Sequence, residues 1–118
     1  MAYSKWLKVD LHIHSHKSNV TKENDYDGSI LTYEKLVTAL KRENINLFSI
    51  TDHNTINIPL YEELINKRKD LINNKMNFII GAEIDFMDEE IHDDVFHMLV
   101  YFNTFDLEKV TKVLTDVY

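Results

Sequence analysis

The sequence has no cysteine, one proline and only two glycines among its 118 residues. Without cysteine, the chain has neither disulfide bonds nor thiolate zinc sites. With only Gly28 and Gly81, it also has no glycine-rich loop to cradle a phosphate and no nucleophile elbow around a serine. No apolar run is long enough to span a bilayer, and the N-terminal residues lack the apolar segment of a signal peptide. These absences favour a cytoplasmic protein that has no membrane partner.

Positive charge is also scarce, because 13 lysines and arginines face 20 acidic residues and the formal net charge is −7. An acidic surface binds nucleic acid poorly in a non-specific manner, although bound divalent cations would change the local field. Hydrophobic residues make up 44% of the chain, which argues against disorder. The length is sufficient for one small domain with a core.

Strands alternate with helices along the chain. Strands are expected at 8–14, 47–50, 77–84 and 95–102, and helices at 33–44, 59–73 and 107–117. Thr32 and Asp106 are suitable N-caps, and Pro59 fits the first turn of its helix. The polar segment 15–29 is long for a connection, which is typical of functional loops. Alternation with buried apolar strands predicts an α/β fold with a parallel sheet.

The first expected strand carries alternating polar and apolar residues. A period of two places Asp10, His12 and His14 on one face of this strand. Imidazole nitrogens and carboxylate oxygens are ordinary ligands of zinc, manganese and iron. Taken alone, the segment is equally consistent with a half-exposed strand that carries surface histidines.

Two further strands end in similar side chains. Asp52 and His53 follow the second expected strand, and Glu83 closes the third. Because the carboxyl ends of parallel strands carry the site in α/β proteins, all three strands are expected to deliver these groups to one edge of the sheet. Asp52 either orients an imidazole or caps the following turn. Gly81 shares the face of Glu83 and is expected to leave room for a metal or a substrate.

The other histidines and acidic residues have competing interpretations. His97 lies in an otherwise apolar run and is either a ligand or a core histidine. His16 and His92 are expected at the surface. Seven of the twelve residues from 83 to 94 are acidic. The glycine and the spacing of a calcium loop are missing there, so a solvated loop is expected.

Four segments follow one another in a recognisable order. They are Asp10-Leu11-His12-Ile13-His14, Ile50-Thr51-Asp52-His53-Asn54, Gly81-Ala82-Glu83 and His97-Met98-Leu99-Val100-Tyr101-Phe102. Together they resemble the motifs of the PHP (polymerase and histidinol phosphatase) family. The resemblance implies an α/β fold, a distorted (β/α)7 barrel with mostly parallel strands. It also implies a metal-dependent phosphoesterase that hydrolyses a phosphate ester with two or three divalent ions, which would be manganese, zinc or iron.

The same resemblance assigns the site residues. The implied metal ligands are His12, His14, Asp27, His53, Glu83 and His97, with Glu83 bridging two ions. The nucleophile would be a water molecule held by the metals, and Asp10 and Asp52 would support the ligands from behind. In the family, the acidic ligand that Asp27 would match lies closer to the first motif. The loop between the motif and Asp27 is longer in this chain.

The family's later histidine and its C-terminal Asp-x-His motif have no counterpart in this sequence. Residues 1–118 are therefore expected to be the N-terminal portion of a single PHP domain, inactive alone, because a barrel of this general type needs ~200 residues or more. Lys5-Trp6 before the first motif resembles PHP domains that precede an SMC-like ATPase region in larger proteins, some of them linked to DNA processing.

Two classes of function therefore remain open. The first is an enzyme that acts on a phosphate ester of a small molecule or a nucleic acid. The second is a non-catalytic interaction or regulatory module in which the fold survives with an incomplete metal site. A count of bound metal ions distinguishes them, because two or three ions favour the enzyme and none or one favours the module.

Overall fold

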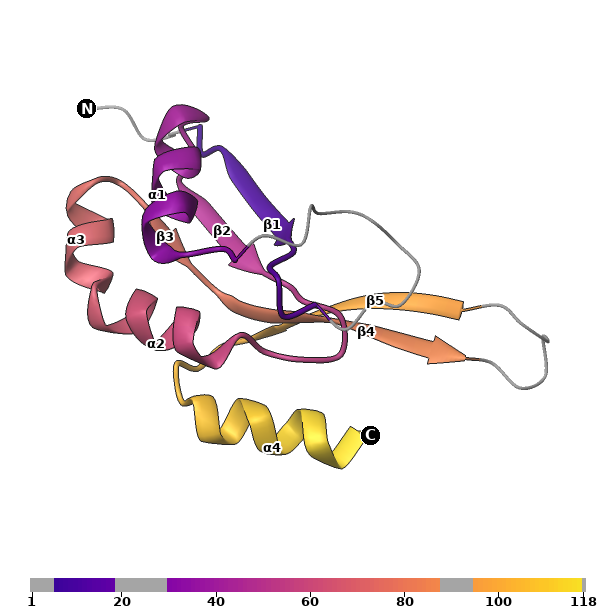
Figure 1. Cartoon of the computed structure of the whole chain (residues 1–118). Helices are drawn as coiled ribbons and strands as arrows, with labels where there is room; N and C mark the ends of the chain where they lie inside the picture. Colours follow the sequence, from indigo (N-terminus) through magenta and orange to yellow (C-terminus); the bar gives the residue numbers. More distant parts are fainter. Residues whose placement is uncertain (1–5, 19–29, 88–94, 118) are drawn as a thin grey trace.

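The computed structural model describes residues 6–18, 30–87 and 95–117 (Figure 1). In chain order the elements are β1 (Val9–Ile13), α1 (Tyr33–Arg42), β2 (Leu47–Ile50), α2 (Ile58–Asn66), α3 (Arg68–Asn73), β3 (Asn77–Phe78), β4 (Ile80–Met87), β5 (Val95–Phe102) and α4 (Leu107–Val117). Asp27, Gly28 and His92 lie outside the described residues, and so does most of the acidic stretch after β4.

Strands β1, β2 and β3 form a parallel sheet, as the sequence predicts, and they lie in the order β1-β2-β3. Helix α1 follows β1 in the chain and packs its apolar stripe into the core. Thr32 is the N-cap of α1, and its side chain accepts a hydrogen bond from the Lys35 backbone N–H. The helix ends at Arg42, two residues before the expected end, and Asn44 takes a left-handed conformation with a φ of 57°.

The expected helix 59–73 is two helices, because the chain bends at Lys67. The residue has a ψ of 16°, which lies outside the helical range and interrupts the regular hydrogen bonding. No glycine or proline marks this bend in the sequence. Pro59 does lie in the first turn of α2, as expected, and Asn57 caps the helix by accepting a hydrogen bond from the Leu60 backbone N–H.

The expected strand 77–84 is also divided. β3 pairs with β2, but β4 leaves the parallel sheet after Ile79 and pairs antiparallel with β5. The hydroxyl of Tyr61, on α2, accepts hydrogen bonds from the backbone N–H groups of Ile50 at 2.9 Å and Gly81 at 3.2 Å. It donates to the Ile50 carbonyl at 2.6 Å, so it takes the groups that a ladder between β2 and β4 would use. The expectation of parallel strands is correct for β1 to β3. β5 runs antiparallel to β4, whereas β4 itself keeps a parallel bridge with the segment after β2.

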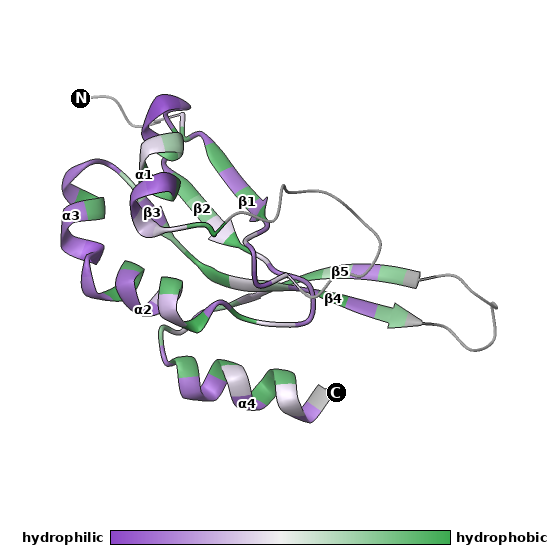
Figure 2. Cartoon of the chain, in the orientation of Figure 1, coloured by the Kyte–Doolittle hydropathy of each residue, from purple (hydrophilic) through white to green (hydrophobic). Residues whose placement is uncertain are grey.

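The apolar core lies between the strands and the helices, and the helices turn their hydrophilic sides outward (Figure 2). Helix α4 begins after Asp106, as expected, and Asp106 accepts hydrogen bonds from the next turn of the helix. Val110 and Leu114 on α4 are buried in the core. The described strands form two separate sheets, so the closed barrel is not seen in this part of the chain. Among the described residues, no helix combines the length and apolar character needed to cross a membrane.

Candidate metal centre

The candidate centre lies where β1 and β2 end. β1 ends at Ile13, one residue before the expected end, so His12 lies in the strand and His14 just beyond it. The Thr51 backbone N–H donates to the Ile13 carbonyl at 2.7 Å and holds the two strand ends together. His53 follows β2 and forms an isolated parallel bridge with Glu83 of β4. The backbone therefore brings three segments of the chain to one edge of the parallel sheet.

Glu83 is the centre of this arrangement, and its two carboxylate oxygens face different imidazoles. Oε1 lies 3.1 Å from His12 Nε2 and 3.6 Å from His14 Nε2. Oε2 lies 2.8 Å from His53 Nε2 and 3.4 Å from His97 Nδ1. The structure thus brings together five of the six residues that the resemblance implies as ligands, and the sixth, Asp27, is outside the described residues.

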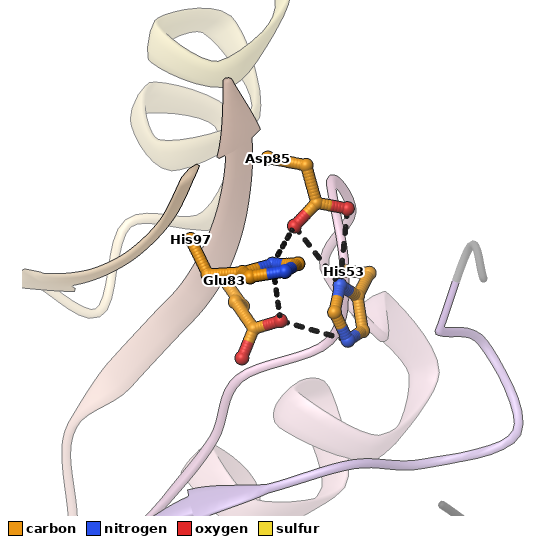
Figure 3. A group of neighbouring side chains, drawn as sticks. All are labelled: His53, Glu83, Asp85 and His97. Carbon is orange, nitrogen blue, oxygen red and sulfur yellow. Dashed lines mark hydrogen bonds and ion pairs between the residues drawn. The ribbon is translucent and has the colours of Figure 1, made fainter. Parts of the chain in front are cut away.

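Asp85 also belongs to the centre, although the sequence analysis placed it in a solvated acidic loop (Figure 3). His53 Nδ1 lies 3.1 Å from both Asp85 oxygens, and His97 Nδ1 lies 2.6 Å from Oδ1. Asn54 exchanges two hydrogen bonds with Asp85, one from its side-chain amide and one to its side-chain oxygen. Burial acts to raise the pKa of Asp85, but the hydrogen bonds from the His97 and His53 rings outweigh it and hold the pKa below its usual value.

The histidine rings differ in their access to solvent. The side chains of His53 and His14 are only 2% and 9% exposed, whereas those of His12 and His97 are 46% and 44% exposed. His12 Nδ1 lies 2.9 Å from the Thr51 hydroxyl, which fixes the orientation of the more exposed ring. The centre therefore has a buried side and a side that a solute can reach.

The donor set and its spacing fit divalent metal ions. Two groups of side chains could each hold an ion, His12, His14 and Glu83 in one, and His53, Glu83, Asp85 and His97 in the other. Atoms that bind one ion at about 2.0–2.1 Å lie about 3.0–3.4 Å apart, which is close to the separations around Glu83. His53 Nε2 is buried and makes no hydrogen bond, although Glu83 Oε2 is near, as expected when both atoms converge on a common point. Nitrogen and oxygen donors without thiolates suit zinc, manganese or iron.

Asp52 and Asp10, which are expected to support the ligands, both accept hydrogen bonds from nearby residues. Asp52 is buried and accepts hydrogen bonds from the backbone N–H and the hydroxyl of Ser15. Burial raises the pKa of Asp52, and the hydrogen bonds from Ser15 offset part of this effect. Asp10 is exposed and accepts the backbone N–H of His12 at 3.3 Å.

His16 is half-buried, and its Nδ1 accepts a hydrogen bond from the Leu31 backbone N–H at 3.1 Å. The expectation for Gly81 needs correction. Gly81 leaves no room for a metal or a substrate. A Cβ at this position would lie 2.6 Å from Ser49 Oγ and 2.9 Å from the Tyr101 ring, so the glycine permits close packing. The Tyr101 hydroxyl also reaches β1 and donates to the Leu11 carbonyl at 2.7 Å.

Comparisons with known proteins find a structural likeness but no match in sequence. No family model matches the sequence, and no curated protein matches it. A crystal structure from Bifidobacterium adolescentis ATCC 15703, of a protein inferred to be a metal-dependent phosphoesterase, matches with a TM-score of 0.60 at 22% identity. The match covers 93% of this chain and 32% of that chain, so this chain spans about a third of the neighbour's length. This likeness shows a shared α/β fold.

Proposed function

We propose that this chain forms part of a metal-dependent phosphoesterase of the PHP type. The observation that carries the proposal is the position of Glu83, whose two oxygens face two separate pairs of imidazoles. A carboxylate in this position can bridge two cations, and paired cations are a recurring device for hydrolysing phosphate esters. The structural neighbour, which is inferred to be a metal-dependent phosphoesterase, supports the same class of function.

The side chains have separate tasks in this proposal. His12 and His14 would hold one ion, His53, Asp85 and His97 would hold the other, and Glu83 would contribute to both. The bound cations would lower the pKa of a water molecule, orient the phosphate and offset charge on the leaving oxygen. The substrate approaches from the side of the centre where the rings of His12 and His97 are exposed.

The finer features of the proposal rest on the resemblance to the PHP family. Asp27 would be a further ligand, two or three ions of manganese, zinc or iron would bind, and Asp10 and Asp52 would support the ligands. The distorted barrel would be completed by sequence outside this chain, in a cytoplasmic protein whose later part could include an ATPase region. The substrate would be a phosphate ester of a small molecule or a nucleic acid. The net charge of −7 makes recognition by the metals more important than general attraction to phosphate.

Metal content tests the ligand assignment. We expect the purified protein to bind manganese, zinc or iron, and the His12→Ala/His14→Ala double variant to lose most of one ion, because two of the three donors in its group are removed. His16→Ala is the matched control, since His16 lies in the same segment and belongs to neither group. Elemental analysis after gel filtration gives the count. Unchanged metal content in the double variant would contradict the assignment.

Hydrolysis of p-nitrophenyl phosphate and bis(p-nitrophenyl) phosphate with added manganese tests the activity, in this chain and in a form extended through the complete domain. We expect the extended form to be active and Glu83→Gln to reduce its rate by orders of magnitude with an unchanged circular dichroism spectrum, because a neutral amide bridges two cations poorly. Full activity in Glu83→Gln would remove the bridging role. Stable binding of one ion or none, without hydrolysis of either ester, would favour the non-catalytic module.

A further inference from the structure

A cluster of buried polar side chains lies behind the candidate centre and outside both groups of potential ligands. Its members are Ser15, Ser18, Asp52 and Asn57, and all four are buried. Burial of polar groups is costly unless they are hydrogen-bonded, and a network whose members are paired makes one arrangement of the chain strongly preferred. The cluster therefore fixes the relative positions of the segments that contribute to it.

Two links in this cluster join the segment after β1 to the segment after β2. In the first, the Asp52 carboxylate accepts the backbone N–H of Ser15 with one oxygen and the Ser15 hydroxyl with the other. In the second, the Ser18 hydroxyl accepts the backbone N–H of His53 at 2.9 Å. Ser15 is itself folded against Ser18 by a hydrogen bond from the Ser18 backbone N–H to the Ser15 carbonyl at 3.1 Å.

The residues that form these hydrogen bonds are adjacent in the sequence to two potential ligands, one from each group. Ser15 directly follows His14, which belongs to the group with His12, and Asp52 directly precedes His53, which belongs to the group with Asp85. The rings of His14 and His53 are 4.5 Å apart between centroids. The Ser15–Asp52 link therefore joins the backbone beside one group to the backbone beside the other.

We propose that Ser15, Ser18 and Asp52 form a clamp that fixes His14 relative to His53 and thereby sets the distance between the two metal positions. The clamp residues are positioning residues, since they act through the backbone of the ligand segments. This inference rests on the proposed function, because it assumes that both groups hold an ion. It assigns to Asp52 a role between the two ligand segments rather than at a single imidazole.

The hydrogen bonds make the Asp52 carboxylate hard to replace, even by asparagine. The Ser15 hydroxyl already accepts from the Asn57 side-chain amide at 3.0 Å and from the Lys17 backbone N–H at 3.2 Å, so its only proton goes to Asp52. An asparagine amide that faced this hydroxyl would add a third donor to a full acceptor. If the amide were flipped, its NH₂ group would face the Ser15 backbone N–H, and two donors would then oppose each other. Asp52→Asn therefore preserves the side-chain volume but breaks one of the two bonds.

Manganese titration and electron paramagnetic resonance test the clamp. We expect the wild-type protein to bind two Mn²⁺ ions whose spins are coupled, giving a multiline spectrum. In Asp52→Asn, and in Ser15→Ala as a second variant, we expect the second ion to bind about 10- to 100-fold more weakly, as is usual when groups behind metal ligands are removed. The spectrum at partial loading should then be that of isolated Mn²⁺. Ser49→Ala is the matched control, since it removes another buried hydroxyl that has no link to the segment after β1.

The outcomes separate the clamp from the proposed function. A coupled pair in wild type and Ser49→Ala, lost in Asp52→Asn or Ser15→Ala at temperatures well below unfolding of the metal-free variants, supports the clamp. A coupled pair of unchanged affinity in both clamp variants overturns the clamp and leaves the proposed function intact. Binding of fewer than two ions by the wild-type protein overturns both.

Discussion

At the scale of single residues, Asp85 is the side chain that joins two of the potential ligands, His53 and His97. It lies within hydrogen-bonding distance of the rings of both His53 and His97. When a histidine donates one ring N–H to a carboxylate, its other nitrogen is held in a fixed direction for a metal. For His53, this leaves Nε2 directed toward Glu83.

We predict that Asp85→Asn lowers metal affinity by about 10- to 100-fold. An amide oxygen in the place of Oδ1 keeps the contact with His97, but the NH₂ group in the place of Oδ2 faces both the His53 ring N–H and the side-chain amide that Asn54 donates. Isothermal titration with Zn²⁺ or Mn²⁺ measures the effect, and Asp70→Asn, an exposed carboxylate on α3, is the control. An affinity equal to that of the control would show that Asp85 has no part in the centre.

Asp85 also shows what single-residue reasoning from the sequence overlooked. It belongs to a run of acidic residues, which is typical of a solvated loop. Yet Asp85 is two positions after Glu83, and a strand that continued past Glu83 would place both on one face. β4 does continue, to Met87. The histidines could be found because each lies in a distinctive short pattern, whereas the role of Asp85 depends on where a strand ends.

At the scale of elements, Tyr61 explains why the predicted third strand is divided. Its fully buried hydroxyl lies between β2 and β4 and satisfies backbone groups of both. Burial raises the pKa of Tyr61 to about 12, so the hydroxyl keeps its proton at neutral pH and can both donate and accept. Helix α2 thereby supports the strand that carries Glu83.

We predict that Tyr61→Phe lowers the free energy of unfolding by about 2–4 kcal/mol, because buried backbone groups of Ile50 and Gly81 lose their partner. Urea denaturation of the metal-free protein measures the change. Tyr33→Phe is the control, since Tyr33 is partly exposed on α1 and should change stability much less. Equal stability of Tyr61→Phe and the wild type would mean that the backbone groups pair in another way.

The elements that could be predicted are those specified by neighbouring residues. Thr32 and Asp106 mark the starts of α1 and α4, and the short apolar run of β2 is clear in the sequence. The division at Ile79 depends on Tyr61, far away in the sequence, and the run from 77 to 84 contains no local break apart from Gly81. The bend at Lys67 likewise lacks a glycine or a proline. For the division at Ile79, a contact between residues distant in the sequence decided the structure.

At the scale of the whole molecule, the β4–β5 hairpin projects away from the three-stranded sheet (Figure 1). On the face of the hairpin opposite Glu83, Phe86 and Phe96 form one cross-strand pair, and Met98 pairs with Ile84. Phe86, Phe96 and Met98 are 40%, 49% and 54% exposed. A cluster of large apolar side chains in solvent favours association.

We predict that the protein self-associates through this face and that a Phe96→Thr/Met98→Thr variant associates less, because threonine keeps the strand preference and removes the apolar surface. Sedimentation velocity over a range of concentrations measures the change. Val113→Thr is the control, since Val113 is equally exposed but belongs to α4 and not to the hairpin. A wild-type protein that remains a monomer at high concentration would contradict the prediction.

The hydrogen bond from Tyr101 to the Leu11 carbonyl has a consequence for the order in which the molecule folds. It joins residues 90 positions apart and ties β5 directly beside His12. A contact of such long sequence separation requires closure of a loop that includes most of the chain, and its entropic cost delays it relative to local helices. We therefore expect the potential ligands on β1 and β5 to meet after the local helices have formed. We expect partly folded states without this contact to lack His97 near the other histidines and therefore to bind metal more weakly than the native state.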